Sequence, residues 1–127
     1  MAPPRVRLRH ASSEACEEDG VRVLVERRWP PGLTREQVDA DLWLREIAPS
    51  EALLRWCNAS PTRWQSFPGM YRAELEARPD LVQVLARLRA ERTVTLLSAA
   101  PEGSANCAAA VLRQVIEEYE EDHIGSR

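Results

Sequence analysis

The alternation of apolar and polar residues predicts three strands. Residues 5–9 read Arg-Val-Arg-Leu-Arg, a period-two pattern typical of an edge strand with one wet face. Residues 21–26 and the centre of residues 92–98 are β-branched and mostly apolar, so both segments are expected to form buried strands. Helical segments lie between them, which indicates an α/β fold in which at least the second and third strands are parallel.

Two helices are predicted soon after the second strand. Thr34 followed by Gln37 has the spacing of a capping box, which predicts a helix from there to about Ile47. Ser50 is expected to cap a second, shorter helix over residues 51–57.

Three further helices are predicted along the rest of the chain. The first begins at Ser60 and Pro61 and contains Pro68, which is expected to kink or split it. The next begins at Pro79, and the last follows a turn through residues 99–104. Each has an apolar stripe at helical spacing that predicts a core-facing side. The stripes are Trp64, Phe67, Tyr71 and Leu75; Leu81, Val84, Leu85 and Leu88; and Ala108, Val111, Leu112, Val115, Ile116 and Tyr119.

These elements predict one domain over residues 1–127, built as a three-layer α/β domain with a small, mostly parallel sheet flanked by helices. A chain of 127 residues is near the commonest domain size and is long enough for a core of its own. Its 44% apolar and 29% charged residues are typical of a globular protein.

The charge balance is mildly acidic, with a net charge of −3, which argues against binding to nucleic acid or to a membrane surface. Residues 1–9 lack the apolar segment of a secretory signal and no stretch is long enough to span a membrane, so a cytoplasmic protein is expected. All seventeen basic residues are arginine. Codon bias explains most of them, and the alternative is that a few guanidinium groups hold an anion as a planar fork.

A small-ligand site is expected beyond the carboxyl ends of the buried strands, where ligands bind in open α/β sheets. The loop Arg27–Gly32 follows the second strand and the loop Ser98–Cys107 follows the third. Arg27 would pair with an anion, and the backbone N–H groups of Ser104–Asn106 at a helix start would cradle it. The alternative for Arg27 is an ion pair with a structural carboxylate such as Glu46.

Aromatic residues could complete such a site by stacking on the ligand. Trp29, on a proline-bounded loop, and Tyr71 are the candidates. The helical surroundings of Trp43, Trp56 and Trp64 favour core positions instead.

The cysteines and histidines give no metal motif. Cys16, Cys57 and Cys107 are odd in number and lack paired spacing, and His10 and His123 stand far apart, so no metal, cofactor or disulfide is expected. Cys107 in the first turn of a helix is a candidate nucleophile. The alternative for Cys107, and the expectation for the other two cysteines, is a small buried apolar side chain.

Five motifs combine along most of the chain: GxRVLVxRxWPxG over residues 20–32, LWLxEIAPSxxL over 42–53, WxxF over 64–67, YxxEL over 71–75 and VTLLxAA over 94–100. In this combination the sequence resembles the YeaO-like family of bacterial and archaeal proteins, domain of unknown function 488. The resemblance implies a compact α/β fold and no assigned reaction.

The chain also departs from the family pattern. Members usually carry aspartate at Glu26, arginine at Pro31, an aromatic residue at Ser98, a basic residue at Pro101 and His-Asn-His or similar at residues 105–107. A divergent member is therefore implied, and any family activity that needs those groups is in doubt here. The expected ligand-binding residues are Arg27, Trp29, Glu46, Tyr71, Ser98, Ser104 and Asn106.

The leading hypothesis is a domain that binds a small anion, such as a nucleotide or a phosphorylated metabolite. A cysteine-dependent enzyme using Cys107 is one alternative. A non-catalytic module for a protein or nucleic-acid partner is the other, and the oligomeric state stays open.

Overall fold

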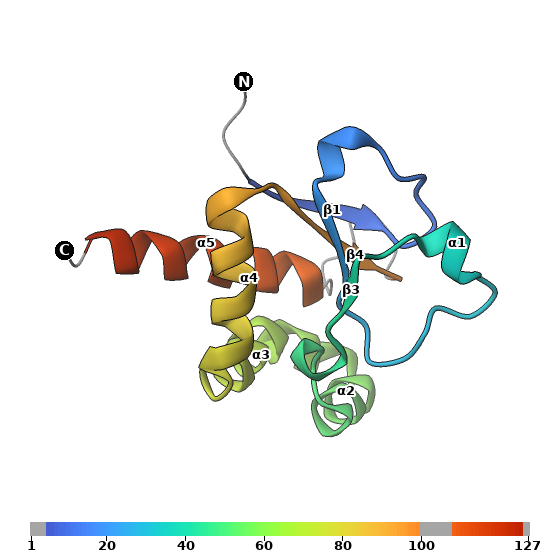
Figure 1. The fold of residues 1–127 in the computed structure, drawn as a ribbon. Coiled ribbons are helices and arrows are strands. Elements are labelled where there is room, and N and C mark those ends of the chain that lie inside the picture. Colours follow the sequence, from blue (N-terminus) through green and yellow to red (C-terminus); the bar gives the residue numbers. More distant parts are fainter. Residues whose placement is uncertain (1–4, 100–107, 126–127) are drawn as a thin grey trace.

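A four-stranded sheet lies at the centre of the computed structural model, which describes residues 5–99 and 108–125 (Figure 1). The strand order is β1-β4-β2-β3 and all neighbouring strands are parallel, which confirms the expected α/β class. In chain order the elements are β1 (Val6–His10), η1 (Glu17–Asp19), β2 (Val21–Leu24), α1 (Arg35–Val38), β3 (Leu42–Trp43), η2 (Arg45–Ile47), α2 (Glu51–Asn58), η3 (Pro61–Ser66), α3 (Phe67–Glu76), α4 (Pro79–Glu91), β4 (Val94–Ser98) and α5 (Ala108–Gly125), where η marks a 3₁₀ helix.

The three expected strands are present, and β4 lies between the other two. Val94 is aligned with Val6 on one side and with Val21 on the other. Residues 94–97 are fully buried because neighbouring strands cover both edges of β4 and packed side chains cover both of its faces. β1 is an edge strand, as its alternating pattern predicted.

The helix predicted from Thr34 to Ile47 is wrong beyond its first turn. The capping box between Thr34 and Gln37 forms, but Asp39 takes a left-handed conformation (φ 47°) that ends α1. The chain then extends, and Leu42–Trp43 pairs with β2 as the short edge strand β3. The apolar residues of this segment therefore lie on an edge strand and a 3₁₀ turn, and not on the predicted helix.

The other helix signals are confirmed. Ser50 caps α2, since its Oγ accepts a hydrogen bond from the N–H of Leu53. The helix that contains Pro68 is split into η3 and α3. In α4 the buried face carries Val82, Leu85 and Ala86, whereas Val84 is 43% exposed, so the predicted stripe is wrong at that position.

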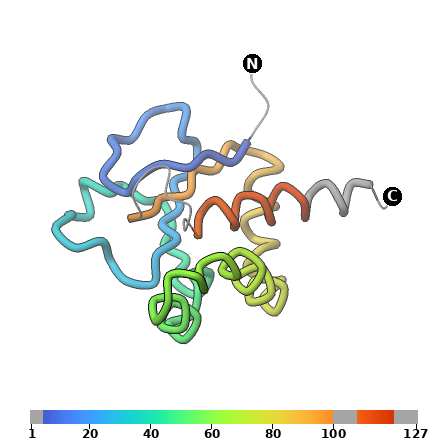
Figure 2. Tube along the Cα trace, turned by 180° about the vertical axis from the view of Figure 1, so that it is seen from behind, coloured from blue at the N-terminus to red at the C-terminus, as the bar shows by residue number. Residues whose placement is uncertain are grey.

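The sheet separates two apolar clusters. Helices α2, α3, α4 and α5 pack on one face around a main core, and α1 with long connecting segments covers the other face (Figures 1 and 2). The main core takes Val21, Val23 and Val25 from β2 and its continuation, and the smaller one takes the alternate residue Leu24. Helices α2 to α5 thus lie on the face of the sheet to which the odd-numbered residues of β2 point.

A buried ionic cluster stabilises the opposite side. Asp19 is completely buried and pairs with Arg7 (3.1 Å), Arg9 (3.1 Å) and Arg22 (2.6 Å). Burial raises the pKa of Asp19, but hydrogen bonds from Arg22, the N–H of Cys16, Arg9 and the Cys16 thiol outweigh burial and lower the pKa from 3.8 to about 2. The cluster joins β1, η1 and β2.

Arg22 is the arginine whose geometry lysine could not reproduce. Besides Asp19, its guanidinium donates to the carbonyl oxygens of Ser13 (3.0 Å), Val38 (2.6 Å) and Asp39 (2.9 Å). A planar fork with five donors fits these four acceptors, whereas an ammonium has only three donors at a single nitrogen.

Some predicted core residues lie at the surface. Cys57 is buried as expected, but Cys16 is exposed, with its thiol beside the ionic cluster, so that prediction is wrong. The predicted core position of Trp56 is also wrong, because this side chain is 38% exposed and lies under the guanidinium of Arg63. Trp43 and Trp64 are partly buried against the two apolar clusters.

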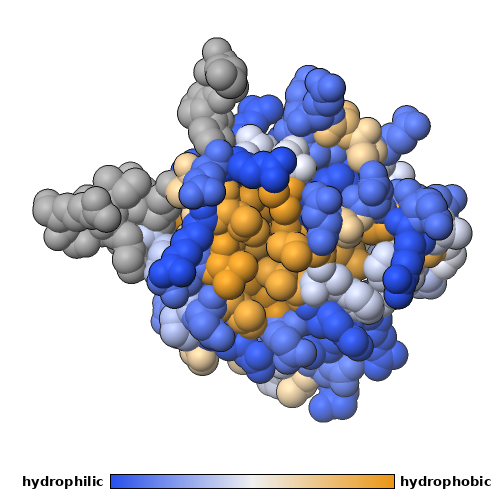
Figure 3. All heavy atoms as spheres, in the orientation of Figure 1, coloured by the Kyte–Doolittle hydropathy of each residue, from blue (hydrophilic) through white to orange (hydrophobic). Residues whose placement is uncertain are grey.

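The face of the molecule seen in Figure 1 carries an apolar area ringed by hydrophilic side chains (Figure 3). Among the described residues, the large apolar side chains with the greatest exposure are Leu42, Trp56, Met70 and Val84. None of the described helices has both the length and the apolar character needed to span a membrane.

Candidate functional site

Arg27 leaves the sheet on the face that carries the helices. It continues the alternation of Val23 and Val25, and its guanidinium donates to the carbonyl oxygens of Ala48 (3.2 Å) and Pro49 (3.4 Å). Within residues 5–99 and 108–125, no carboxylate forms an ion pair with Arg27. The guanidinium is therefore held in place by neutral acceptors.

The expected alternative, an ion pair between Arg27 and Glu46, is wrong. The carboxylate of Glu46 instead faces Arg78, with 3.7 Å between the nearest nitrogen and oxygen. Both side chains are more than half exposed, so this pair is weak and leaves both groups accessible.

Ser50 and Glu74 form a polar contact of two hydrogen bonds near Arg27. One carboxylate oxygen of Glu74 accepts from the backbone N–H of Ser50 (2.9 Å), and the other accepts from its hydroxyl (2.5 Å). Because Ser50 also caps α2, the contact fixes the start of α2 against the last turn of α3. The contact thus holds together the two helices whose residues line the cavity beside Arg27.

Tyr71 is a structural residue at this place. Its ring is 1% exposed and stacks on Phe67, with 5.6 Å between ring centroids, and its hydroxyl donates to the carbonyl of Ile47 (2.6 Å). No open ring face is available for a ligand, so the predicted stacking by Tyr71 is wrong. The hydroxyl end still lines the cavity.

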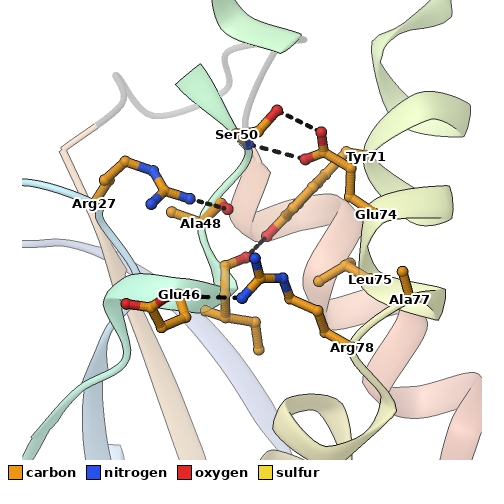
Figure 4. A pocket seen from close by; sticks show the side chains of 10 residues that line it. Arg27, Glu46, Ala48, Ser50, Tyr71, Glu74, Leu75, Ala77 and Arg78 are labelled. Carbon is orange, nitrogen blue, oxygen red and sulfur yellow. Dashed lines mark hydrogen bonds and ion pairs between the residues drawn. The ribbon is translucent and has the colours of Figure 1, made fainter. Parts of the chain in front are cut away.

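A cavity of about 170 Å³ lies between these groups, and we call it the inner cavity (Figure 4). Two guanidinium groups, two carboxylates and two hydroxyl groups line it together with four apolar residues. Its residues are Arg27, Glu46, Ile47, Ala48, Ser50, Tyr71, Glu74, Leu75, Ala77 and Arg78.

A wider hollow of about 530 Å³ shares three residues with the inner cavity, and we call it the arginine mouth. Four arginines and one glutamate line it. Its residues are Arg27, Arg28, Arg45, Ser50, Glu51 and Arg78. Arg28 pairs with Glu51 (3.1 Å) in an exposed ion pair, and the guanidinium of Arg45 lies 4.7 Å from the ring centre of Trp43.

The remaining predicted site residues lie elsewhere or outside the described residues. Trp29 packs edge-on against Trp43 on the smaller apolar cluster, and its Nε1 donates to the carbonyl of Leu33. The Ser98 hydroxyl donates to Glu26, which turns away from Arg27 by strand alternation. Ser104, Asn106 and Cys107 fall in the segment 100–107, outside the described residues.

Of the predicted residues, the structure thus brings Arg27, Glu46 and Tyr71 to one cavity. The sequence reasoning missed Arg45, Arg78 and Glu74. Arg45 and Glu74 occur inside or beside two of the family motifs, which is the only sequence signal for them. Arg78 precedes Pro79 at the start of α4, and only folding brings it opposite Arg27.

Replacing Ser50 by alanine is expected to lower the free energy of unfolding by about 1–2 kcal/mol, because the α2 cap and a hydrogen bond to a carboxylate are both lost. Urea unfolding measures the effect. Ser60→Ala is the matched control, since Ser60 precedes η3 without a side-chain cap and should cost less than half as much. Equal losses in the two variants would contradict the structural role given to Ser50.

The site combines guanidinium groups, which donate hydrogen bonds, with carboxylate and hydroxyl groups that accept them. Among the described residues, no group of three or more metal-ligating side chains comes together. The guanidinium groups offer charge-assisted hydrogen bonds, which are strongest with phosphate and carboxylate oxygens.

Sequence comparison places the chain among proteins without an assigned activity. It matches the family described as "Inactive DUF488-N3 subclade" over residues 5–126. It is 33% identical over 112 residues to uncharacterised proteins of Mycobacterium tuberculosis and Mycobacterium bovis, covering 88% of this chain and 93% of each relative. It is 32% identical over 92 residues to the uncharacterised protein YeaO of Escherichia coli, covering 72% of this chain and 80% of that protein. No solved structure shows significant similarity to the chain.

Proposed function

The chain belongs to the DUF488 family, in the N3 subclade described as inactive, and we propose that it binds a small phosphate-bearing anion at the arginine mouth without converting it. The expected membership of the YeaO-like family is confirmed by the same matches. The proposal keeps the anion but moves it from the predicted crevice to the side of the sheet that carries the helices.

The observation that carries the proposal is an excess of positive charge at one hollow. Four arginines and a single carboxylate, that of Glu51, line this hollow, in a protein whose net charge is −3. Such a local excess attracts anions even when the whole surface is acidic. The N-terminus of α2, an eight-residue helix capped by Ser50, adds a partial positive charge at the same hollow.

Arg27 is best suited to hold the anion. Its two carbonyl contacts orient the guanidinium before a ligand arrives, so little side-chain freedom is lost on binding. Those carbonyls also leave donors unused, because a guanidinium has five and two contacts are made. Arg78, in only a weak pair with Glu46, faces the same hollow.

Titration calorimetry with inorganic phosphate and ethyl phosphate tests the proposal. Arg27→Ala is expected to weaken binding of both probes by about 10-fold or more, the equivalent of one charge-assisted hydrogen bond. Arg27→Lys is expected to recover only part of that loss, since an ammonium cannot hold the anion as a fork.

Arg55→Ala is the matched control, because Arg55 is an exposed arginine of α2 outside both hollows. It should bind both probes as the wild type does. Wild-type protein that gives no heat with either probe would end the proposal, and so would Arg27→Ala binding with unchanged affinity.

A further inference from the structure

The inner cavity differs from the arginine mouth in its charge balance. The mouth has four guanidinium groups and one carboxylate, whereas the inner cavity has two of each. The two hollows share Arg27, Ser50 and Arg78. A ligand held by these arginines at the mouth can therefore extend into the inner cavity, which Glu46 and Glu74 line (Figure 4). Such a ligand would contact mainly guanidinium groups at one end, and guanidinium groups together with carboxylates at the other.

The carboxylates of the inner cavity act only as acceptors. An ionised carboxylate offers about four lone-pair sites. Glu74 accepts two hydrogen bonds from Ser50, and Glu46 has one long contact with Arg78, so both keep accepting capacity. A ligand group that displaces water from them must therefore donate hydrogen bonds, or it leaves a carboxylate desolvated and unpaired.

Hydroxyl groups fit this requirement better than an ammonium group. Two guanidinium groups line the same cavity, and each carboxylate already has a donor facing it. The guanidinium groups would repel the positive charge of an ammonium group, and the carboxylates would offset this repulsion only in part. A hydroxyl donates to a carboxylate and accepts from a guanidinium without carrying charge.

The size of the inner cavity limits the carbon frame. At about 170 Å³ it is smaller than the roughly 300–1,000 Å³ of pockets for drug-sized ligands. A short polyol or a single sugar ring is of this scale, and a sugar together with a nucleobase is not.

We infer that the ligand is a hydroxyl-bearing phosphate ester of the sugar-phosphate class, with its phosphoryl group at the arginine mouth and its hydroxyl groups against Glu46 and Glu74 in the inner cavity. The inference rests on the proposed anion binding and adds the chemistry of the rest of the ligand. It makes Glu46 a specificity-determining residue, since this carboxylate is accessible and weakly paired.

Calorimetry with ribose 5-phosphate, butyl phosphate and phosphoethanolamine tests the inference. Ribose 5-phosphate is expected to bind at least about 10-fold more tightly than butyl phosphate, because only the sugar satisfies the carboxylates. In Glu46→Gln this preference is expected to fall several-fold. Glu51→Gln removes a carboxylate that lies at the mouth only, so it should change the affinity for all three probes alike and leave the preference intact.

Equal binding of ribose 5-phosphate and butyl phosphate would overturn the inference and leave the anion proposal standing. Tighter binding of phosphoethanolamine, or a preference unchanged in Glu46→Gln, would overturn it as well. If inorganic phosphate and all three esters fail to bind, the proposed function fails too. Glu46 is 68% exposed, so its variant is expected to fold, and a thermal unfolding curve checks this.

Discussion

Replacing Asp19 by asparagine is expected to lower the free energy of unfolding by about 3–5 kcal/mol, because removing one partner of a buried ion pair leaves the other charge uncompensated. Arg22 is only 3% exposed and cannot move its guanidinium into water without breaking three contacts to carbonyl oxygens. Asparagine keeps the size of the side chain, so the loss reports the charge rather than a cavity.

The same carboxylate predicts a distinctive dependence on pH. Since the pKa of Asp19 is about 2 in the folded protein and 3.8 is the ordinary value, its contribution is fully present above about pH 4 and is lost as the pH falls towards 2. The difference between the two pKa values corresponds to about 2 kcal/mol. The stability gap between the wild type and Asp19→Asn should therefore narrow by about 2 kcal/mol between about pH 5 and pH 2.

Urea unfolding followed by tryptophan fluorescence measures both effects. Glu18→Gln is the control, since Glu18 is the exposed residue next to Asp19 in η1, and it should change stability by less than about 0.5 kcal/mol. A gap for Asp19→Asn that stays constant down to pH 2 would show that the carboxylate is not the titrating partner of these arginines.

Replacing Gly20 by alanine is expected to lower the free energy of unfolding by about 2–5 kcal/mol. The residue has φ 61°, where an L side chain is strained by about 1–2 kcal/mol, and a Cβ would lie 2.1 Å from the carbonyl oxygen of Thr93. That oxygen accepts the hydrogen bond from Val21 that begins the pairing of β2 with β4, so the clash is expected to separate the two central strands and add about 1–3 kcal/mol.

Gly32→Ala separates the two contributions. Gly32 also has a positive φ, 82°, but a Cβ there meets nothing within 4 Å, so only the backbone strain of about 1–2 kcal/mol remains. Urea midpoints for the two variants give the comparison. Equal losses at Gly20 and Gly32 would mean that the contact with Thr93 relaxes at no cost.

The parts of the fold that the sequence predicted are those governed by local rules. The apolar centre of β4, the caps at Thr34 and Ser50 and the split at Pro68 depend on residues that are neighbours in the chain. β3 was missed because it is two residues long and its pairing with β2 depends on a left-handed residue, Asp39, that no spacing rule identifies.

In the site too, local rules predicted some residues, and only the fold brings the others together. The sequence placed Arg27 directly after the second strand, but its neighbours Arg45 and Arg78 come from a 3₁₀ turn and the start of a distant helix. Composition alone also could not tell which arginine has a structural need for its guanidinium. The prediction favoured Arg27, and the fork that lysine cannot replace is at Arg22, whose partners are mostly backbone carbonyls.

The position of β4 has a consequence for synthesis on the ribosome. β4 is the last strand in the sequence of the described residues, yet it is the one that joins β1 to β2. β1 and β2 are not neighbours in the sheet, so they cannot take their final positions until β4 lies between them. The ionic cluster that links β1 to β2 also depends on these positions. The four-stranded sheet can therefore be completed only after residue 98 has left the exit tunnel, and until then β1 has no strand to pair with, which leaves it open to chaperones and proteases.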